Sequence, residues 1–156
     1  MTLQSILSPE LVFCNMAGGS KKRLLENSAE LIASKVSNVT ANQIYEALIA
    51  REQLGSTGLG EGIAIPHCRI PRCQTTIGCL MKLKTPVDFD AIDRKPVDLL
   101  FFLLVPENTL EGHLDTLRML AENFTSPAFC ERLRAAETDE ALFQAAIAGT
   151  EASHTA

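Results

Sequence analysis

The stretch Leu99-Leu100-Phe101-Phe102-Leu103-Leu104-Val105 is the longest unbroken apolar run in the chain, and Pro106 follows it directly. It is too short for a helix that crosses a bilayer, which needs about 20 apolar residues. A short apolar run without polar alternation is typical of a central β-strand that is covered on both faces. The sequence therefore predicts an α/β fold, with this strand in the middle of a sheet flanked by helices.

Further strands are expected on the N-terminal side of this run, at residues 63–65 and 75–83. The connection over residues 84–96 is long, which favours a mixed rather than a purely parallel sheet. Ser20 is a plausible N-cap for an amphipathic helix that reaches Val36. Thr40-x-x-Gln43 is a capping box for a second helix, which should end near Leu54 and place Arg51 at its C-terminal end.

Three more helices are expected after Pro106. The first has an apolar stripe formed by Leu110, Leu114, Leu117, Leu120 or Ala121, and Phe124, with His113 beside it. Ser126-Pro127 opens the next helix, since Ser can cap it and Pro can occupy its first position. Thr138 opens the last helix. No linker divides the chain, so we expect one domain over residues 1–148 and a polar C-terminal tail over residues 149–156.

Composition and charge argue against several classes of partner and site. The chain has 156 residues and a net charge of −5, the wrong overall sign for gripping nucleic acid backbones. Its N-terminus lacks the features of a secretory signal, so a reducing cytoplasm without membrane insertion is expected. An odd number of cysteines without C-x-x-C spacing argues against a disulfide framework and against common zinc patterns. These cysteines are Cys14, Cys68, Cys73, Cys79 and Cys130.

The stretch from Arg51 to Arg69 is the most informative about chemistry. Four glycines lie in the eight residues from Gly55 to Gly62, and Pro66-His67 follows a short apolar segment. Proline restricts the backbone, so the imidazole of His67 should be presented rigidly from a strand end. A neutral imidazole is a nucleophile near pH 7 and can both accept and pass on a phosphoryl group, without a metal or cofactor.

Ser56, Thr57 and Gly58 are candidates for a phosphate-binding loop, because glycines let backbone N–H groups approach an anion. No Gly-Lys-[Ser/Thr] follows, so nucleotide binding is not supported. Taken singly, His67 could be a hydrogen-bonded surface group, and Arg51 a surface charge at a helix C-terminus. His113 could equally be a histidine that flanks the core. A zinc site formed by His67 with the nearby cysteines would have unusual ligand spacing.

The segment Gly55-Ser-Thr-Gly-Leu-Gly-Glu-Gly-Ile-Ala-Ile-Pro-His67 resembles the phosphorylation site of the fructose/mannitol-type (type 2) enzyme IIA domains of the bacterial phosphotransferase system. The resemblance extends over nearly the whole chain, from Ile6-Leu7-Ser8-Pro9 to His113-Leu114-x-x-Leu117-x-x-Leu120-Ala121. The helix start Ser20-Lys21-Lys22-Arg23 resembles the nitrogen-regulatory branch in particular. The resemblance implies the mixed-sheet sandwich of EIIA type 2 domains.

The resemblance also implies roles for single residues. His67 would take phosphate through its Nε2 from a phosphohistidine carrier protein (HPr- or NPr-like), with His113 as the second active-site histidine and Arg51 as nearby positive charge. The phosphorylation state would then decide which regulatory target is bound, and sensor kinases and potassium transporters are implied target classes. Two alternatives stay open: a sugar-specific IIA component that passes phosphate to a separate IIB, and a regulatory binding module without phosphotransfer.

Position 68 departs from the family pattern. Members commonly carry a small glycine or alanine after the histidine, whereas this chain has Cys68. We hypothesise that oxidation or alkylation of the Cys68 thiol blocks docking of the donor protein.

Overall fold

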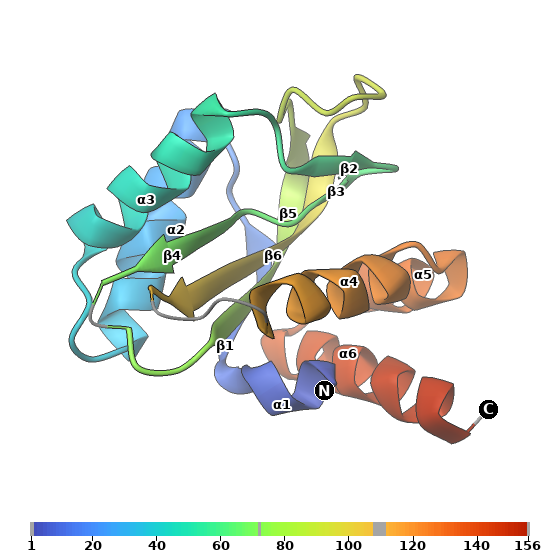
Figure 1. Cartoon of the computed structure of the whole chain (residues 1–156). Helices are drawn as coiled ribbons and strands as arrows, with labels where there is room; N and C mark the ends of the chain where they lie inside the picture. The colour runs from blue at the N-terminus through green and yellow to red at the C-terminus, as the bar shows by residue number, and fades with distance from the viewer. Residues whose placement is uncertain (1, 72, 108–111, 156) are drawn as a thin grey trace.

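The computed structural model describes residues 2–71, 73–107 and 112–155, with backbone alone for residues 112, 113 and 149–155. Among these residues, the strands lie in the first two thirds of the chain, and three helices follow the last strand (Figure 1). The elements are α1 (Leu3–Ile6), β1 (Leu7–Met16), α2 (Lys21–Lys35), α3 (Ala41–Gln53), β2 (Gly58–Gly60), β3 (Ile63–Ala64), β4 (His67–Ile70), β5 (Ile77–Val87), β6 (Val97–Pro106), α4 (Gly112–Phe124), α5 (Pro127–Ala135) and α6 (Asp139–Thr155).

Strand β6 is central to a mixed sheet. The strand order is β1-β5-β6-β3-β2, and β4 also pairs with β6. Strand β6 is antiparallel to β5 but parallel to β3 and β4, and β1 is parallel to β5. The expected mixed sheet with flanking helices is therefore confirmed, as is the position of residues 99–105 at its centre.

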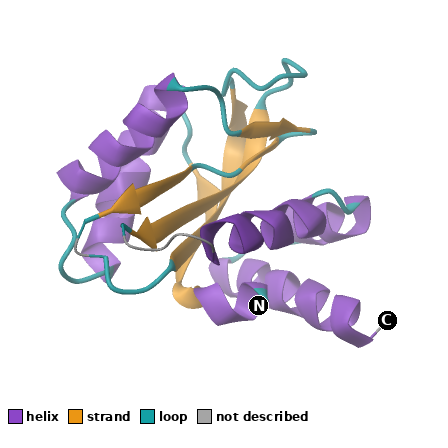
Figure 2. Ribbon diagram, viewed as in Figure 1, coloured by secondary structure: helices purple, strands orange, loops and turns teal. Residues whose placement is uncertain are grey.

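Both faces of β6 are buried, which explains its unbroken apolar sequence. Leu100, Phe102 and Leu104 belong to one core, which α2 and α3 cover. Their neighbours in the strand, such as Phe101 and Leu103, belong to a second core with residues of α1, α4, α5 and α6. Side chains alternate between the faces of a strand, so a strand buried on both faces needs apolar residues throughout. Figure 2 shows the two helical layers with the strands between them.

One edge of β6 carries the segment that delivers His67. The pairs Ile63↔Leu99 and His67↔Leu103 keep one parallel register, although the segment is divided into β3 and β4 around Pro66. The backbone N–H of Leu103 donates to the Pro66 carbonyl at 2.9 Å, so the ladder continues across the break. The expectation that His67 ends a strand is wrong: it begins β4, because Pro66 interrupts the strand and pairing resumes after it.

The helix ends follow their capping signals. Ser20 caps α2 and accepts from the Arg23 N–H, and Thr40 and Gln43 form the predicted capping box of α3. Helix α3 ends at Gln53, immediately before the glycine-rich segment, with Arg51 in its last turn. Ser126 caps α5, which has proline in its first turn. These predictions are confirmed.

The apolar stripe of α4 differs from the expectation. Leu120 and Phe124 are buried as predicted, but Leu114 is 63% exposed, and Thr116 is buried instead. Leu114 lies in the first turns of α4, beyond the part of the helix that packs on the second core. Leu110 lies outside the described residues. Helix α6 extends to Thr155 and so includes most of the segment that was expected to be a separate tail.

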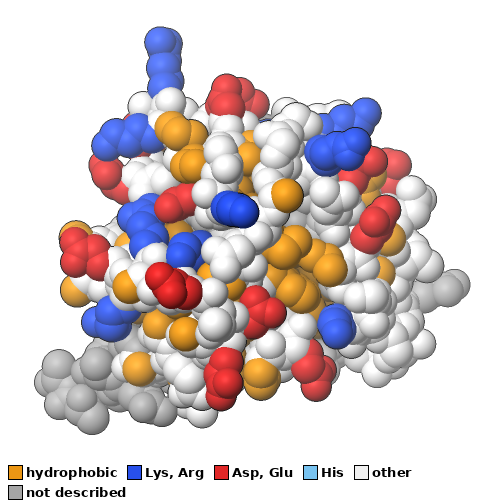
Figure 3. Space-filling model, turned by 180° about the vertical axis from the view of Figure 1, so that it is seen from behind, with side chains coloured by type: hydrophobic (Ala, Val, Ile, Leu, Met, Phe, Trp, Pro, Cys, Tyr) orange, Lys and Arg blue, Asp and Glu red, His pale blue; other side chains and the backbone are white. Residues whose placement is uncertain are grey.

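Helix hydropathy and surface charge bear on the expected absence of membrane and nucleic acid partners. No helix within the described residues has the length and hydropathy needed to cross a bilayer. On the face turned away from the viewer in Figure 1, Lys and Arg side chains are interspersed with Asp and Glu (Figure 3). This distribution gives no continuous basic patch on that face for a phosphate backbone.

Gly78 provides a test of the sheet packing. A Cβ at this position of β5 would lie 2.6 Å from the Phe101 ring and 2.9 Å from the Ile6 carbonyl oxygen. Overpacking of this kind costs about 1–3 kcal/mol. We expect Gly78→Ala to lower the free energy of unfolding by that amount in urea titrations. Thr85→Ala, at an exposed position of the same strand, should change it by less than about 0.5 kcal/mol. Equal stability of the two variants would contradict the packing described.

Candidate functional site

The last turn of α3 and the start of β4 bring Arg51 and His67 together. The Nε–H of Arg51 donates to Nε2 of His67 at 3.3 Å, and Nη1 donates to the Gly55 carbonyl at 2.9 Å. The guanidinium therefore bridges the imidazole and the beginning of the glycine-rich segment. Both side chains are half-buried, so the ring keeps access to the surface.

The hydrogen bonds of His67 assign its tautomer. Nδ1 lies 2.8 Å from the Ile65 carbonyl oxygen, which can only accept. Nδ1 therefore carries the proton, and Nε2 of the neutral ring is the acceptor for Arg51. Nε2 is thus the nitrogen that holds an in-plane electron pair, next to a cation.

The surroundings keep the imidazole neutral. Burial lowers the pKa of His67 below its ordinary value of 6.5, and the positive charge of Arg51 lowers it further. The hydrogen bond to Ile65 and the negative charge of Glu52 act in the opposite direction. The net effect is a ring that is unprotonated near pH 7, as a nitrogen nucleophile requires.

The candidate loop residues are bonded to other parts of the chain. Both the hydroxyl and the backbone N–H of Thr57 donate to the Glu52 carboxylate. The Ser56 hydroxyl donates to the Phe89 carbonyl at 2.8 Å and accepts from the Gly58 N–H at 3.0 Å. These donors fix the shape of the loop, and they already have partners in the unphosphorylated protein.

His113 lies on the side of the sheet toward which His67 is turned. His67 shares its register with Leu103, a member of the second core, and alternation places its side chain on the same face. The backbone of His113 belongs to the first turn of α4, one of the helices that cover this face. The side chain of His113 lies outside the described residues, so its role stays a prediction.

The structure removes the premise of the Cys68 hypothesis. Cys68 is 7% exposed and packs in the first core, on the opposite face of β4 from His67. Burial raises the pKa of its thiol to about 12, so the reactive thiolate is scarce at neutral pH. Within the described residues, no three His, Cys, Asp or Glu side chains gather as metal ligands would.

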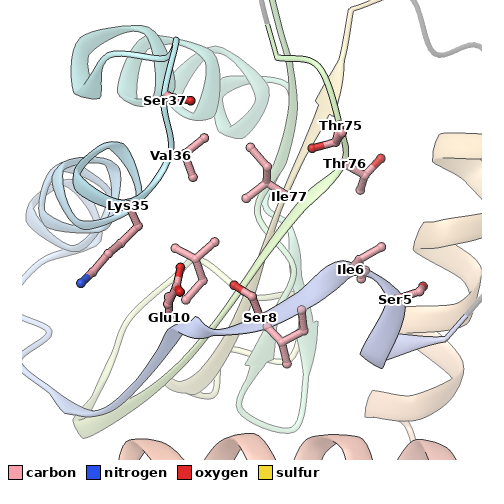
Figure 4. Close-up of a pocket in the computed structure, with 12 residues that line it drawn as sticks. Ser5, Ile6, Ser8, Glu10, Lys35, Val36, Ser37, Thr75, Thr76 and Ile77 are labelled. Atoms are coloured by element: carbon pink, nitrogen blue, oxygen red, sulfur yellow. The ribbon is translucent and has the colours of Figure 1, made fainter.

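A cavity of about 400 Å³ lies elsewhere, between the start of β1, the end of α2 and the start of β5 (Figure 4). Ser8, Glu10, Lys35 and Ile77 are among its lining residues, whereas His67 and Arg51 are not. The imidazole is therefore not part of this cavity.

Sequence reasoning missed Glu52 and Lys21. The side chain of Glu52 is 5% exposed and pairs with Lys21 Nζ at 2.8 Å. The sequence held a signal for both residues. Glu52 is an acid in the last turn of α3 and Lys21 is a base in the first turn of α2, and each charge is unfavourable with respect to the dipole of its helix. Such positions are unfavourable for the isolated helix, so these two charges were candidates for partners elsewhere in the chain.

Comparison with known proteins identifies a single family. Residues 5–147 match the model of the family described as "Phosphoenolpyruvate-dependent sugar phosphotransferase system, EIIA 2". A nitrogen regulatory protein of Pseudomonas aeruginosa is 51% identical over 145 residues, covering 93% of this chain and 94% of the relative. One from Escherichia coli K12 is 43% identical over 145 residues, with 92% and 88% covered.

Solved structures show the same fold. The crystal structure of nitrogen regulatory protein IIA-Ntr from Neisseria meningitidis has a TM-score of 0.84 and 40% identity, and the match covers 90% of this chain and 96% of that one. IIA mannitol from Escherichia coli shares the fold with a TM-score of 0.74 at 20% identity, with 88% and 96% covered.

The chain therefore belongs to the EIIA type 2 family of the phosphoenolpyruvate-dependent sugar phosphotransferase system. Its function is that of a IIA phosphoryl carrier of the nitrogen-regulatory kind, with a phosphohistidine intermediate. Domains of this family take phosphate from HPr-like carriers. The family, the branch and the fold expected from the sequence are confirmed.

The charge of Arg51 provides a test of the site's electrostatics. Because the guanidinium lowers the pKa of His67, Arg51→Met should raise this pKa toward 6.5. The matched control is Arg69→Met. Arg69 is an exposed arginine on β4, the strand that carries His67, and its substitution should leave the pKa of His67 unchanged. The measurement is an NMR titration of the His67 ring protons. An unchanged or lower pKa in Arg51→Met would show that the guanidinium does not act on the ring.

The burial of Cys68 gives a second prediction. A thiol reagent at pH 8 should modify the half-buried Cys14 of the folded protein and spare Cys68, whereas unfolded protein should be modified at all five cysteines. Phosphate acceptance should survive the treatment of the folded protein. Mass mapping that finds Cys68 modified first would contradict the structure.

Proposed function

We propose that the chain accepts a phosphoryl group on Nε2 of His67, in the cytoplasm, from a phosphohistidine carrier protein of the HPr or NPr kind. The observation that carries the proposal is the pair of hydrogen bonds on the imidazole. Ile65 holds the proton on Nδ1, and Arg51 lies at Nε2. The nucleophilic nitrogen is thereby selected before the donor protein arrives.

The transfer itself exchanges one P–N bond for another. The electron pair of Nε2 forms the new bond to phosphorus, and the electron pair of the broken bond returns to the donor's imidazole. The proton on Nδ1 stays in its hydrogen bond to Ile65. No metal or cofactor takes part in this balance.

Arg51 and His113 have the roles of donors to the transferred group. Charge is spread over three equatorial oxygens in the transition state, and a guanidinium carries more N–H groups than the two that Arg51 uses to bond His67 and Gly55. By analogy with oxyanion holes, removing one preorganised donor would cost about 2.7–4 kcal/mol. Ser56, Thr57 and Gly58 act by shaping the loop, since their donors are engaged within the protein.

Phosphorylation would also act as the regulatory signal. It adds about two negative charges at a ring that is neutral beforehand. Such a change weakens docking of an acidic or apolar partner surface and favours a basic one. The regulated targets in this proposal are partner proteins such as sensor kinases and potassium transporters.

The sugar-specific alternative has less support. Over the chain, the nitrogen regulatory relatives reach 51% identity, whereas a fructose-specific EIIABC component of Bacillus subtilis reaches 27%. Incubating the phosphorylated chain with purified fructose and mannitol IIB domains separates the two roles. Retention of the phosphoryl group is expected for a regulator, and rapid loss to a IIB domain indicates sugar uptake.

The site assignment is tested with phosphorylated carrier protein as donor. We expect the wild type to gain one acid-labile phosphate on His67, and His67→Ala to gain none, because no other nucleophile of the described site has this geometry. His154→Ala should behave as wild type. Mass spectrometry maps the modified residue. A His67→Ala variant that is phosphorylated at the wild-type rate would contradict the assignment, and a wild type that accepts nothing would favour the binding module.

A further inference from the structure

Lys21, from the start of α2, meets Glu52 and Thr57 in a largely buried cluster next to the site, and we call these three residues the Glu52 clamp. Lys21 Nζ lies 2.8 Å from Glu52 Oε2, and both the hydroxyl and the N–H of Thr57 donate to the same carboxylate. Thr57 is 5% exposed, as is the Glu52 side chain. The carboxylate is thus bonded from two sides and is largely shielded from water.

The clamp joins three segments. Lys21 begins α2, Glu52 lies in the last turn of α3, and Thr57 is in the glycine-rich loop. Lys21 also donates to the Phe89 carbonyl at 3.3 Å and lies 4.6 Å from the centre of the Phe89 ring. Neither charge is at a helix end that favours it, so the helix dipoles do not account for either residue.

Two chains of hydrogen bonds lead from the loop to the two nitrogens of the His67 ring, one starting at Thr57 and the other at Gly55. The Thr57 carbonyl accepts from the Ile65 N–H at 3.1 Å, and the Ile65 carbonyl accepts from Nδ1. Two residues before Thr57, the Gly55 carbonyl accepts from Arg51 Nη1, and Arg51 Nε donates to Nε2. A shift of Thr57 would therefore move the partners of both nitrogens.

We propose that Glu52 and Thr57 are positioning residues for phosphoryl transfer, with Lys21 as the counter-ion that allows a carboxylate to be buried there. The clamp holds the loop so that Ile65 and Arg51 fix the tautomer and the orientation of the His67 ring. It acts through these residues and does not contact the reacting atoms. The inference rests on the proposed role of His67, and it gives a function to Lys21, within the Ser-Lys-Lys-Arg helix start.

The test compares Thr57→Val, which keeps the size of the side chain but lacks the hydroxyl, with Thr57→Ser, which keeps the hydroxyl. Single-turnover transfer from phosphorylated carrier protein is measured over a range of donor concentrations. A misplacement of about 1 Å can cost ~100-fold in rate, and we expect Thr57→Val to lose about tenfold or more. The apparent affinity for the donor should stay unchanged, and Thr57→Ser should transfer close to the wild-type rate.

Glu52→Gln adds a readout that general destabilisation would not produce. The carboxylate raises the pKa of His67, so its removal should lower that pKa further while the transfer rate falls. Glu61→Gln is the matched control, since Glu61 forms an exposed pair with Lys95 at 3.2 Å. This control should change neither the transfer rate nor the pKa of His67.

The outcomes separate this inference from the proposed function. Phosphorylation of the wild type on His67 with equal rates for Thr57→Val and Thr57→Ser would overturn the positioning role alone. If Glu52→Gln does not fold, the Thr57 pair decides. A wild type that is not phosphorylated on His67 would overturn the proposed function itself.

Discussion

The parallel pairing of β3 and β4 with β6 is the constraint on which the site depends. One register runs from Ile63↔Leu99 to His67↔Leu103, and Pro66 interrupts the strand without shifting it. This register turns His67 toward the helical layer that contains α4 and turns Cys68 into the opposite core. It also places the Ile65 carbonyl where it can accept from Nδ1. The hydrophobic burial of β6 thus supports the chemistry of one imidazole.

Two charged residues that are adjacent in the sequence act on that imidazole. Arg51 and Glu52 are adjacent in α3, and they shift the pKa of His67 in opposite directions. Arg51 is half-buried and bonds Nε2 of His67, whereas the Glu52 side chain is buried and paired with Lys21. Such a pair would place the positive charge of Arg51 next to Nε2 and keep the negative charge of Glu52 in its ion pair with Lys21. A phosphoryl carrier needs this asymmetry, since the group that it accepts is an anion.

Local signals predicted much of this structure, and the misses are non-local. The caps at Ser20 and Thr40 and the apolar run of β6 are readable because they depend on neighbouring residues. Strand β1 was missed because Ser8, Pro9 and Glu10 interrupt its apolar pattern, and its pairing with β5 is what defines it. His67 and Arg51 were singled out from the glycine-rich segment, the helix end and the family resemblance, and the structure brings their side chains within hydrogen-bond distance. The partner of Glu52 could not be found, because Lys21 approaches it only after α2 and α3 pack together.

The central claim is that the fold selects Nε2 of His67 as the nucleophile by holding the proton on Nδ1. The most direct measurement is NMR of protein labelled with ¹⁵N in histidine, recorded before and after phosphorylation near pH 7.5. The account predicts a neutral ring protonated at Nδ1 in the free protein, and a phosphoryl group on Nε2 afterwards. A ring protonated at Nε2, or phosphorus bonded to Nδ1, would contradict it.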